Sequence, residues 1–444
     1  MTGTADACDE PLAQEAQDTV DATRFATDIQ RFANHVTGAT MRSGVRPAAI
    51  AFIFVTVVLD VVSMGIIIPV LPKLVVTFMA GDTARAATIF GVFGTVWALM
   101  QFIFSPVIGA LSDRYGRRNV ILLSNVGLGL DYMVMALAPT LGWLLAGRVI
   151  SGITGASWAT AGAYIADVSP PEKRASGFGL LGAAFGLGFV IGPALGGLLG
   201  VMSSRLPFWV AAGLTLLNAL YGFFVLPESL PPSKRTNKFQ WARANPVGSL
   251  KLLRSQHELF GLASVNVIYF LAHNVLPSVF VLFAGYRYGW DARAVGLTLA
   301  AVGVCTMIVQ AGLVKHAVAK LGERRALLIG LAFGTISFAI WGLAPTGLLG
   351  CLAIPFGALM GLYGPSAQGL MTRRVSPSEQ GQLQGANSSI MGITGMVGPG
   401  LFTLTFAYFI GPRSPWHAPG APFLLAAFLT TCALVLAWRV TRAR

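Results

Sequence analysis

Three ionisable residues lie inside long apolar runs of the sequence, where a charge is costly to keep. Asp60 lies in the middle of a run from Ala48 to Val70, and Asp131 and Arg148 lie in two later runs. A charged carboxylate at the centre of a membrane helix costs about 2.5–3.5 kcal/mol on the milder insertion scale, and such residues mark proton and ion pathways. The pattern therefore predicts that Asp60 carries a proton.

The depth of each residue indicates which of the three can meet. Counted from the turn at Pro139, Asp131 and Arg148 both lie about 12–14 Å below the surface, at a helical rise of about 1.5 Å per residue. Asp60 lies roughly 18 Å from Pro72 by the same rise. We expect Asp131 and Arg148 to form either a polar pair that responds to the charge of Asp60 or a purely structural bridge. The run around Asp60 has no basic residue to neutralise it.

The composition indicates that the segments containing these three residues lie in a membrane. The chain is 55% hydrophobic and 11% charged, whereas soluble domains are about 25% charged. Lipid offers no hydrogen bonds to an open strand, and the runs lack the alternation of an outer-membrane barrel, so we expect helices. The sequence predicts an all-α membrane protein with twelve spans, near residues 47–70, 87–110, 119–138, 142–164, 176–201, 207–227, 258–284, 294–315, 326–344, 347–371, 383–410 and 421–438.

The chain repeats itself at a nearly constant offset. Asp113–Arg118 matches Ala319–Arg324 at an offset of 206 residues, and Gly192-Pro193 matches Gly398-Pro399 at the same offset. A third match, Val168–Glu172 with Val375–Glu379, has an offset of 207. The repeat predicts two six-helix bundles, residues 47–227 and 258–438, joined by a basic linker over residues 228–257. Two such halves around a midplane site suit alternating access.

The distribution of charge indicates the orientation of the chain. With the N-terminus inside, 22 Lys and Arg residues fall on the inner side and 6 on the outer side, so both termini, including the basic tail over residues 439–444, are expected in the cytoplasm. The net charge of +13 then reflects the basic residues that orient the chain in the membrane, and no nucleic-acid partner is expected. Residues 1–46 are interpreted as a flexible acidic tail, or translation starts at Met41.

Several kinds of chemistry are not predicted. The four cysteines share no metal-ligand spacing, and the sequence has no nucleotide-binding loop and no nucleophile constellation. We therefore expect no metal, no cofactor and no enzymatic activity. The expected partners are the lipid bilayer, protons and a small molecule, and the sequence leaves the oligomeric state open.

Two motifs carry a family resemblance. Gly109-Ala-Leu-Ser-Asp113-Arg-Tyr-Gly116-Arg-Arg118 resembles the signature loop of the major facilitator superfamily, and Gly188-Phe-Val-Ile-Gly192-Pro-Ala-Leu-Gly196-Gly197 resembles its antiporter motif. Within that superfamily, further segments resemble the tetracycline/proton antiporters: Leu59–Pro72, Gly147–Ala156, Ala163–Asp167 and Gln380–Gly385. The resemblance implies export of a drug through the bacterial inner membrane, driven by proton entry.

The signature loop has a mechanical interpretation. Asp113 at the end of a span can face the positive N-terminal end of a neighbouring helix, and Arg114, Arg117 and Arg118 can bridge to Asp167. Contacts that exist in one of two states would latch the cytoplasmic side shut. The alternative is that the arginines are topological anchors. In the antiporter motif, small residues allow close helix packing and a proline bends the helix, which suits a seal against proton leak. The alternative is ordinary close packing of helices in lipid. The residues of the motif are Gly188, Gly192, Pro193, Gly196 and Gly197.

The sequence gives less information about the substrate than about the fold. Gln101 and Gln310 match polar positions of the tetracycline family and are our candidate substrate contacts, whereas most other polar residues inside spans are expected to form interhelical hydrogen bonds. Tetracycline, free or as a divalent-cation complex, is one candidate substrate. Tetracycline exporters commonly carry a histidine and an aspartate where this chain has Thr306 and Gly334. Two alternatives stay open, an importer of a small nutrient such as a sugar and a non-transporting scaffold or receptor.

Overall fold

The computed structural model describes residues 47–155, 157–169, 174–235, 250–253, 257–376, 379–412 and 414–442. The predicted acidic tail and most of the predicted linker lie outside these residues. In the described part all regular structure is helical, and ten helices are long and apolar enough to cross a membrane. The chain is therefore a multi-pass membrane protein, and the predicted all-α class is confirmed.

The helices of the first half pack around a core that includes Phe93, Tyr132 and Phe208. Gly116, whose φ is +100°, ends one helix and begins the next, and a φ of this kind is adopted readily by glycine alone. The helices are α2 (Pro47–Ile67), α3 (Leu71–Phe78), α4 (Thr83–Tyr115), α5 (Arg117–Leu137), α6 (Leu141–Thr154), α7 (Ser157–Val168), α8 (Arg174–Met202) and α9 (Leu206–Val225).

The helices of the second half surround an aromatic core that includes Phe280, Trp341 and Phe423. They are α11 (His257–His273), α12 (Val275–Tyr288), α13 (Ala292–Ile308), α14 (Val314–Leu343), α15 (Gly347–Cys351), α16 (Ala353–Leu359), α17 (Tyr363–Thr372), α18 (Gln380–Ile410) and α19 (Ala421–Val440). Four short elements complete the described chain, η2 (Pro232–Lys234), α10 (Leu250–Leu253), the π-helix η4 (Val309–Leu313) and η5 (Met360–Leu362).

The second half has the break that the sequence predicts between its second and third spans, which are expected to end at 315 and to begin at 326. Inside the stretch Val314–Leu343, Gly322 is non-helical, with a φ of +76° and a ψ of 159°. Gly322 is the repeat counterpart of Gly116, so both halves have a glycine elbow at the same place.

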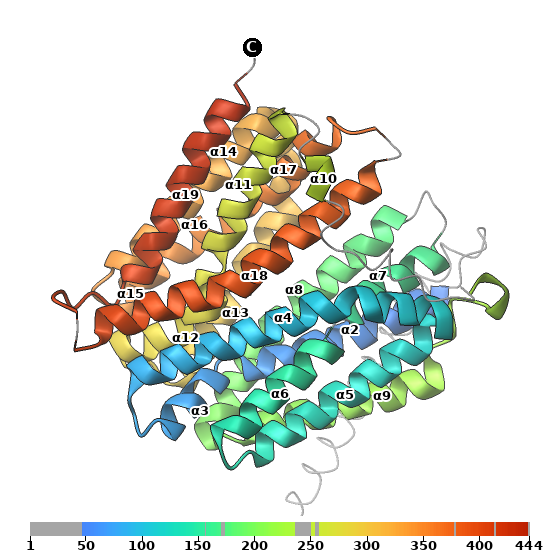
Figure 1. The fold of residues 1–444 in the computed structure, drawn as a ribbon, viewed down its shortest axis with the longest axis horizontal. Coiled ribbons are helices and arrows are strands. Elements are labelled where there is room, and N and C mark those ends of the chain that lie inside the picture. Colours follow the sequence, from blue (N-terminus) through green and yellow to red (C-terminus); the bar gives the residue numbers. More distant parts are fainter. Residues whose placement is uncertain are drawn as a thin grey trace, which may run out of the picture.

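The two halves meet mainly along two helix pairs, α8 with α13 and α4 with α18, and α12 makes smaller contacts with α3 and α4. Figure 1 shows α4 and α18 running side by side, with the blue-to-green helices on one side and the yellow-to-red helices on the other. In the described chain, two hydrogen bonds join the halves, from Lys73 Nζ to the Trp290 oxygen at 2.7 Å and from Thr95 Oγ1 to the Met396 oxygen at 3.0 Å. Neither bond lies near the signature loop.

Candidate functional site

Asp60 lies on α2 and is held by uncharged amides from two other helices. Asn218 of α9 donates from Nδ2 to Asp60 Oδ1 at 2.8 Å and to the Thr56 backbone oxygen at 2.9 Å. Asn125 of α5, with its amide nitrogen turned toward the carboxyl, donates to the two carboxyl oxygens of Asp60 at 3.3 and 3.2 Å. Both asparagines are fully buried, whereas Asp60 is half-buried. The expected interhelical hydrogen bonds are confirmed here.

The charge of Asp60 has no counter-ion among the described residues. None of the ion pairs in the described chain includes this carboxylate. An amide can donate to a charged carboxylate and can also accept from a neutral carboxylic acid. The two asparagines therefore hydrogen-bond to the carboxyl of Asp60 without supplying a positive charge that would keep it ionised.

Asp131 and Arg148 form the predicted pair. Arg148 Nη2 lies 3.5 Å from Asp131 Oδ2, and the Asp131 side chain is fully buried while that of Arg148 is 15% exposed. The same nitrogen lies 3.3 Å from Met135 Sδ. A Cβ atom at Gly147 would lie 2.6 Å from Asp131 Oδ1, so glycine next to the arginine allows α6 to approach the acid. The role of the pair stays a prediction.

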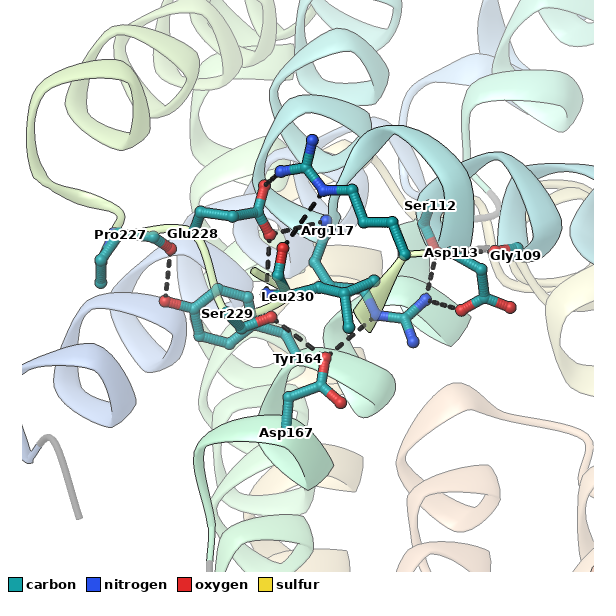
Figure 2. A network of polar contacts seen from close by, with 11 residues as sticks. Gly109, Ser112, Asp113, Arg117, Tyr164, Asp167, Pro227, Glu228, Ser229 and Leu230 are labelled. Atoms are coloured by element: carbon teal, nitrogen blue, oxygen red, sulfur yellow. Dashed lines mark hydrogen bonds and ion pairs between the residues drawn. The ribbon is translucent and has the colours of Figure 1, made fainter. Parts of the chain in front are cut away.

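Arg117 is the centre of a polar network at the signature loop (Figure 2). Its guanidinium donates to Ser112 Oγ at 2.6 Å, pairs with Asp113, and lies 3.1 Å from Asp167 Oδ2 through Nε. Ser112 Oγ in turn donates to the Gly109 backbone oxygen at 2.7 Å. The predicted bridge from the loop to α7 is therefore present through Arg117.

Three expectations about this loop were wrong in this structure. Arg114 and Arg118 do not bridge to Asp167, because Arg114 lies over the Tyr115 ring at 5.2 Å, whereas Arg118 donates to the Phe223 backbone oxygen of α9. Asp113 pairs with Arg117 instead of facing a helix N-terminus. That place at the start of α5 is taken by another acid, Glu228, whose Oε1 accepts the Arg117 backbone N–H at 2.9 Å. Every contact of the network lies within residues 109–235.

The antiporter motif places α8 between the helix of Asp60 and the second half. A Cβ at Gly188 would lie 2.6 Å from Val61 Cβ, and Gly192 and Gly65 approach so closely that a Cβ on either would lie 2.7–2.9 Å from the other's Cα. Gly196 faces the Ile66 backbone in the same way. The opposite face of α8 meets α13, where a Cβ at Gly197 would lie 2.6 Å from the Ala292 oxygen. Pro193 lies inside this helix without ending it.

Gly192→Ala is expected to destabilise the protein by about 1–3 kcal/mol, because the added methyl group overpacks the contact with the α2 backbone. The measurement is the thermal unfolding midpoint in detergent. Gly182→Ala is the matched control, since Gly182 lies on the same helix and a methyl group added there would meet nothing within 4 Å. A Gly192→Ala midpoint equal to that of the control would show that the close approach of α2 and α8 is not required.

Comparison with known proteins identifies the family. The model of the Major Facilitator Superfamily matches residues 53–399 and 262–444. The chain belongs to the major facilitator superfamily. It is 39% identical over 381 residues to the class C tetracycline resistance protein of Escherichia coli, covering 86% of this chain and 94% of the relative. It is 34% identical over 401 residues to the class H tetracycline resistance protein of Pasteurella multocida, covering 88% and 96%.

Solved structures show the same major facilitator fold at low sequence identity. The nucleoside transporter NupG has a TM-score of 0.72 and 12% identity, covering 89% of this chain and 100% of that structure. The human organic anion transporter MFSD10 has a TM-score of 0.66 and 22% identity, covering 88% and 99%.

The second half of this major facilitator chain carries a neutral counterpart of Asp60. At the repeat offset of 206 residues, Asp60 corresponds to Asn266 of α11. Asn266 accepts from the Tyr363 hydroxyl at 2.5 Å and donates to Asn387 at 3.1 Å. Its neighbours Tyr363 and Tyr269 stack with ring centroids 3.7 Å apart. Where the first half holds Asp60, the second half therefore holds an amide beside two stacked aromatic rings.

The two candidate substrate residues lie in separate halves and are not brought together by a contact. Gln101 Nε2 donates to the Gly155 oxygen at 3.5 Å, and Gln310 Nε2 donates to the Gly361 oxygen at 3.4 Å. Gln310 lies on η4, and π-helical turns inside longer helices are frequent at functional sites. Their role in binding stays a prediction.

The segment after α9 contributes residues to the Arg117 network that sequence reasoning missed. Glu228, Ser229 and Leu230 complete the network around Arg117 and Asp167, although the charge pattern places them at the start of a basic linker. The signal available in the sequence was an acidic residue directly after Pro227, at the end of an apolar run.

Proposed function

We propose that this chain is a proton-coupled exporter of small amphipathic compounds across the bacterial inner membrane, working by alternating access. The observation that carries the proposal is a half-buried carboxyl on α2, held by two neutral amides and without a cation among the described residues. A tetracycline-type antiporter needs such a group. The identity of more than a third to the class C tetracycline resistance protein, over most of both chains, supports the same activity.

The proposed architecture has twelve spans in two bundles of six, residues 47–227 and 258–438. Two observations explain how ten candidate spans correspond to twelve. One continuous stretch, Ala292–Leu343, is long enough for two spans and has its elbow at Gly322. The two shorter apolar helices α6 and α7 together supply the fourth span, because α7 follows α6 directly in sequence.

Both termini are proposed to lie in the cytoplasm, as the distribution of basic residues indicates. The loop with Lys73 is then outside, and the hydrogen bond from Lys73 to Trp290 joins the halves on that side. The signature loop is inside, and its network stays within the first half. We propose that the conformation is closed toward the outside, with the cytoplasmic contacts between halves forming in the opposite state.

The test is transport by the full chain in inverted membrane vesicles, with tetracycline as the first substrate, alone and with Mg²⁺. An acidic vesicle interior is expected to drive accumulation of the drug, and added drug is expected to release protons from the vesicles. A protonophore should abolish both effects. Movement of substrate together with protons would instead indicate an importer, and no substrate-dependent proton movement with any tested drug would support a scaffold.

A further inference from the structure

The segment that follows α9 folds against the signature loop (Figure 2). At its beginning, the Tyr164 hydroxyl of α7 donates to the Pro227 oxygen at 2.9 Å. One residue beyond Glu228, Ser229 Oγ donates to Asp167 Oδ2 at 3.2 Å. At its end, Arg235 Nε donates to the Leu230 oxygen at 3.2 Å. The segment from Pro227 to Arg235, which we name the strap, is thus held to α7 at its beginning and folded back on itself by Arg235 at its end.

Glu228 joins the strap to the loop. Its Oε1 accepts the backbone N–H groups of Arg117 at 2.9 Å and Leu230 at 3.0 Å, and its Oε2 lies 3.5 Å from Arg235 Nη2. Arg117 is the first residue of α5, so its N–H has no acceptor within the helix. A carboxylate at this end of a helix is also favoured by the helix dipole.

Among the described residues, the two glycine elbows of the repeat differ in what packs against them. Gly116 and Gly322 are counterparts with φ of +100° and +76°. A Cβ at Gly116 would lie 2.8 Å from Arg235 Nη2 and 2.8 Å from Glu228 Cδ, whereas a Cβ at Gly322 would meet nothing within 4 Å. The elbow beside the Arg117 network is packed by the strap, and its counterpart in the second half is open among the described residues.

We propose that Glu228 is a positioning residue of the cytoplasmic gate and that it couples the strap to the signature loop. Its carboxylate holds the backbone of Arg117, and the guanidinium of the same residue contacts Asp113 and Asp167. The strap leads into the proposed linker to the second half, so movement of that half acts on Arg117 through Glu228 and Arg235. This inference rests on the proposed function, because it assigns a gating role to the loop.

The first test is the kinetics of transport in inverted vesicles. Glu228→Ala is expected to lower the maximal rate about ten-fold, the size expected for loss of one charge-assisted hydrogen bond, with KM for the drug changed less than about two-fold. Glu228→Gln keeps an oxygen for the Arg117 N–H and loses the charge that faces Arg235, so a smaller loss is expected. Glu379→Ala is the matched control, because Glu379 accepts the Ser376 backbone N–H at 3.0 Å on the second half. An equal loss in the control would overturn the proposal.

The second test does not depend on transport. Spin labels at Asn119 and Ser233, both exposed, report the distance between the start of α5 and the strap in a chain whose native cysteines are serine. A narrow distance distribution is expected, with broadening in Glu228→Ala and none in Glu379→Ala. If the unaltered chain moves no drug, the proposed function fails while the label distances still decide this inference. Where Glu228→Ala does not insert, Glu228→Met replaces it, because methionine fills similar space and offers no oxygen to the Arg117 N–H, and an unchanged distribution in that variant overturns the coupling.

Discussion

Replacing Asp60 with asparagine is expected to abolish pH-driven export while leaving the chain folded in the membrane. Asparagine has nearly the same shape as aspartate and stays neutral, so the carrier can no longer exchange a proton. The neighbouring amides of Asn125 and Asn218 can still bond to it, because an amide offers both a donor and an acceptor. The measurement is drug accumulation in inverted vesicles with and without an imposed pH gradient.

The control for this variant is Asp82→Asn. Asp82 is an acid outside the apolar run that accepts the Arg85 backbone N–H at 3.0 Å, and its replacement is expected to leave gradient-driven export intact. Uphill export retained by Asp60→Asn at the level of this control would show that another group carries the proton.

Replacing Arg148 with methionine is expected to be the most destabilising single change in the first half. Asp131 is fully buried, and removing its cation leaves an uncompensated charge, which costs about 3–5 kcal/mol when a buried pair is broken. The measurements are the unfolding midpoint in detergent and the amount of protein inserted in the membrane. The double variant Asp131→Asn with Arg148→Met is expected to recover most of the stability, because no charge remains buried.

The double variant also separates the two roles open for this pair. If the pair responds to the charge of Asp60, the double variant folds and fails to export against a gradient. If the pair is a structural bridge, the double variant exports like the unaltered chain. An Arg148→Met variant as stable as the unaltered protein would contradict the ion pair itself.

The depth of a residue in a membrane helix could be predicted from the sequence, and its partners across helices could be predicted less well. The fixed helical rise was enough to pair Asp131 with Arg148, which are 3.5 Å apart. The partner of Asp60 lies 158 residues away on α9, and nothing in the run around Asp60 identifies Asn218 among the other intramembrane amides. That choice depends on how three helices pack together.

The contacts of the signature loop could also be predicted only in part from the sequence. The motif predicted a bridge from its arginines to Asp167, but the spacing could not tell which arginine makes it, since this depends on the turn at Gly116. Glu228, 111 residues from Arg117, takes the helix N-terminus that Asp113 was expected to face. The spacing within a motif indicates which contacts its residues are able to make. It does not show that Glu228, from a distant part of the chain, competes with Asp113 for the start of α5.

The two asparagines that contact Asp60, Asn125 and Asn218, have a consequence for proton exchange at this position. When the nitrogen of the Asn125 amide faces the carboxyl, its oxygen accepts from Asn218 Nδ2 at 3.1 Å, so each of the two amides orients the other. A neutral carboxyl group keeps its carbonyl oxygen as an acceptor for these donors. The charged and the neutral group can therefore occupy the same site without repacking of the surrounding apolar side chains.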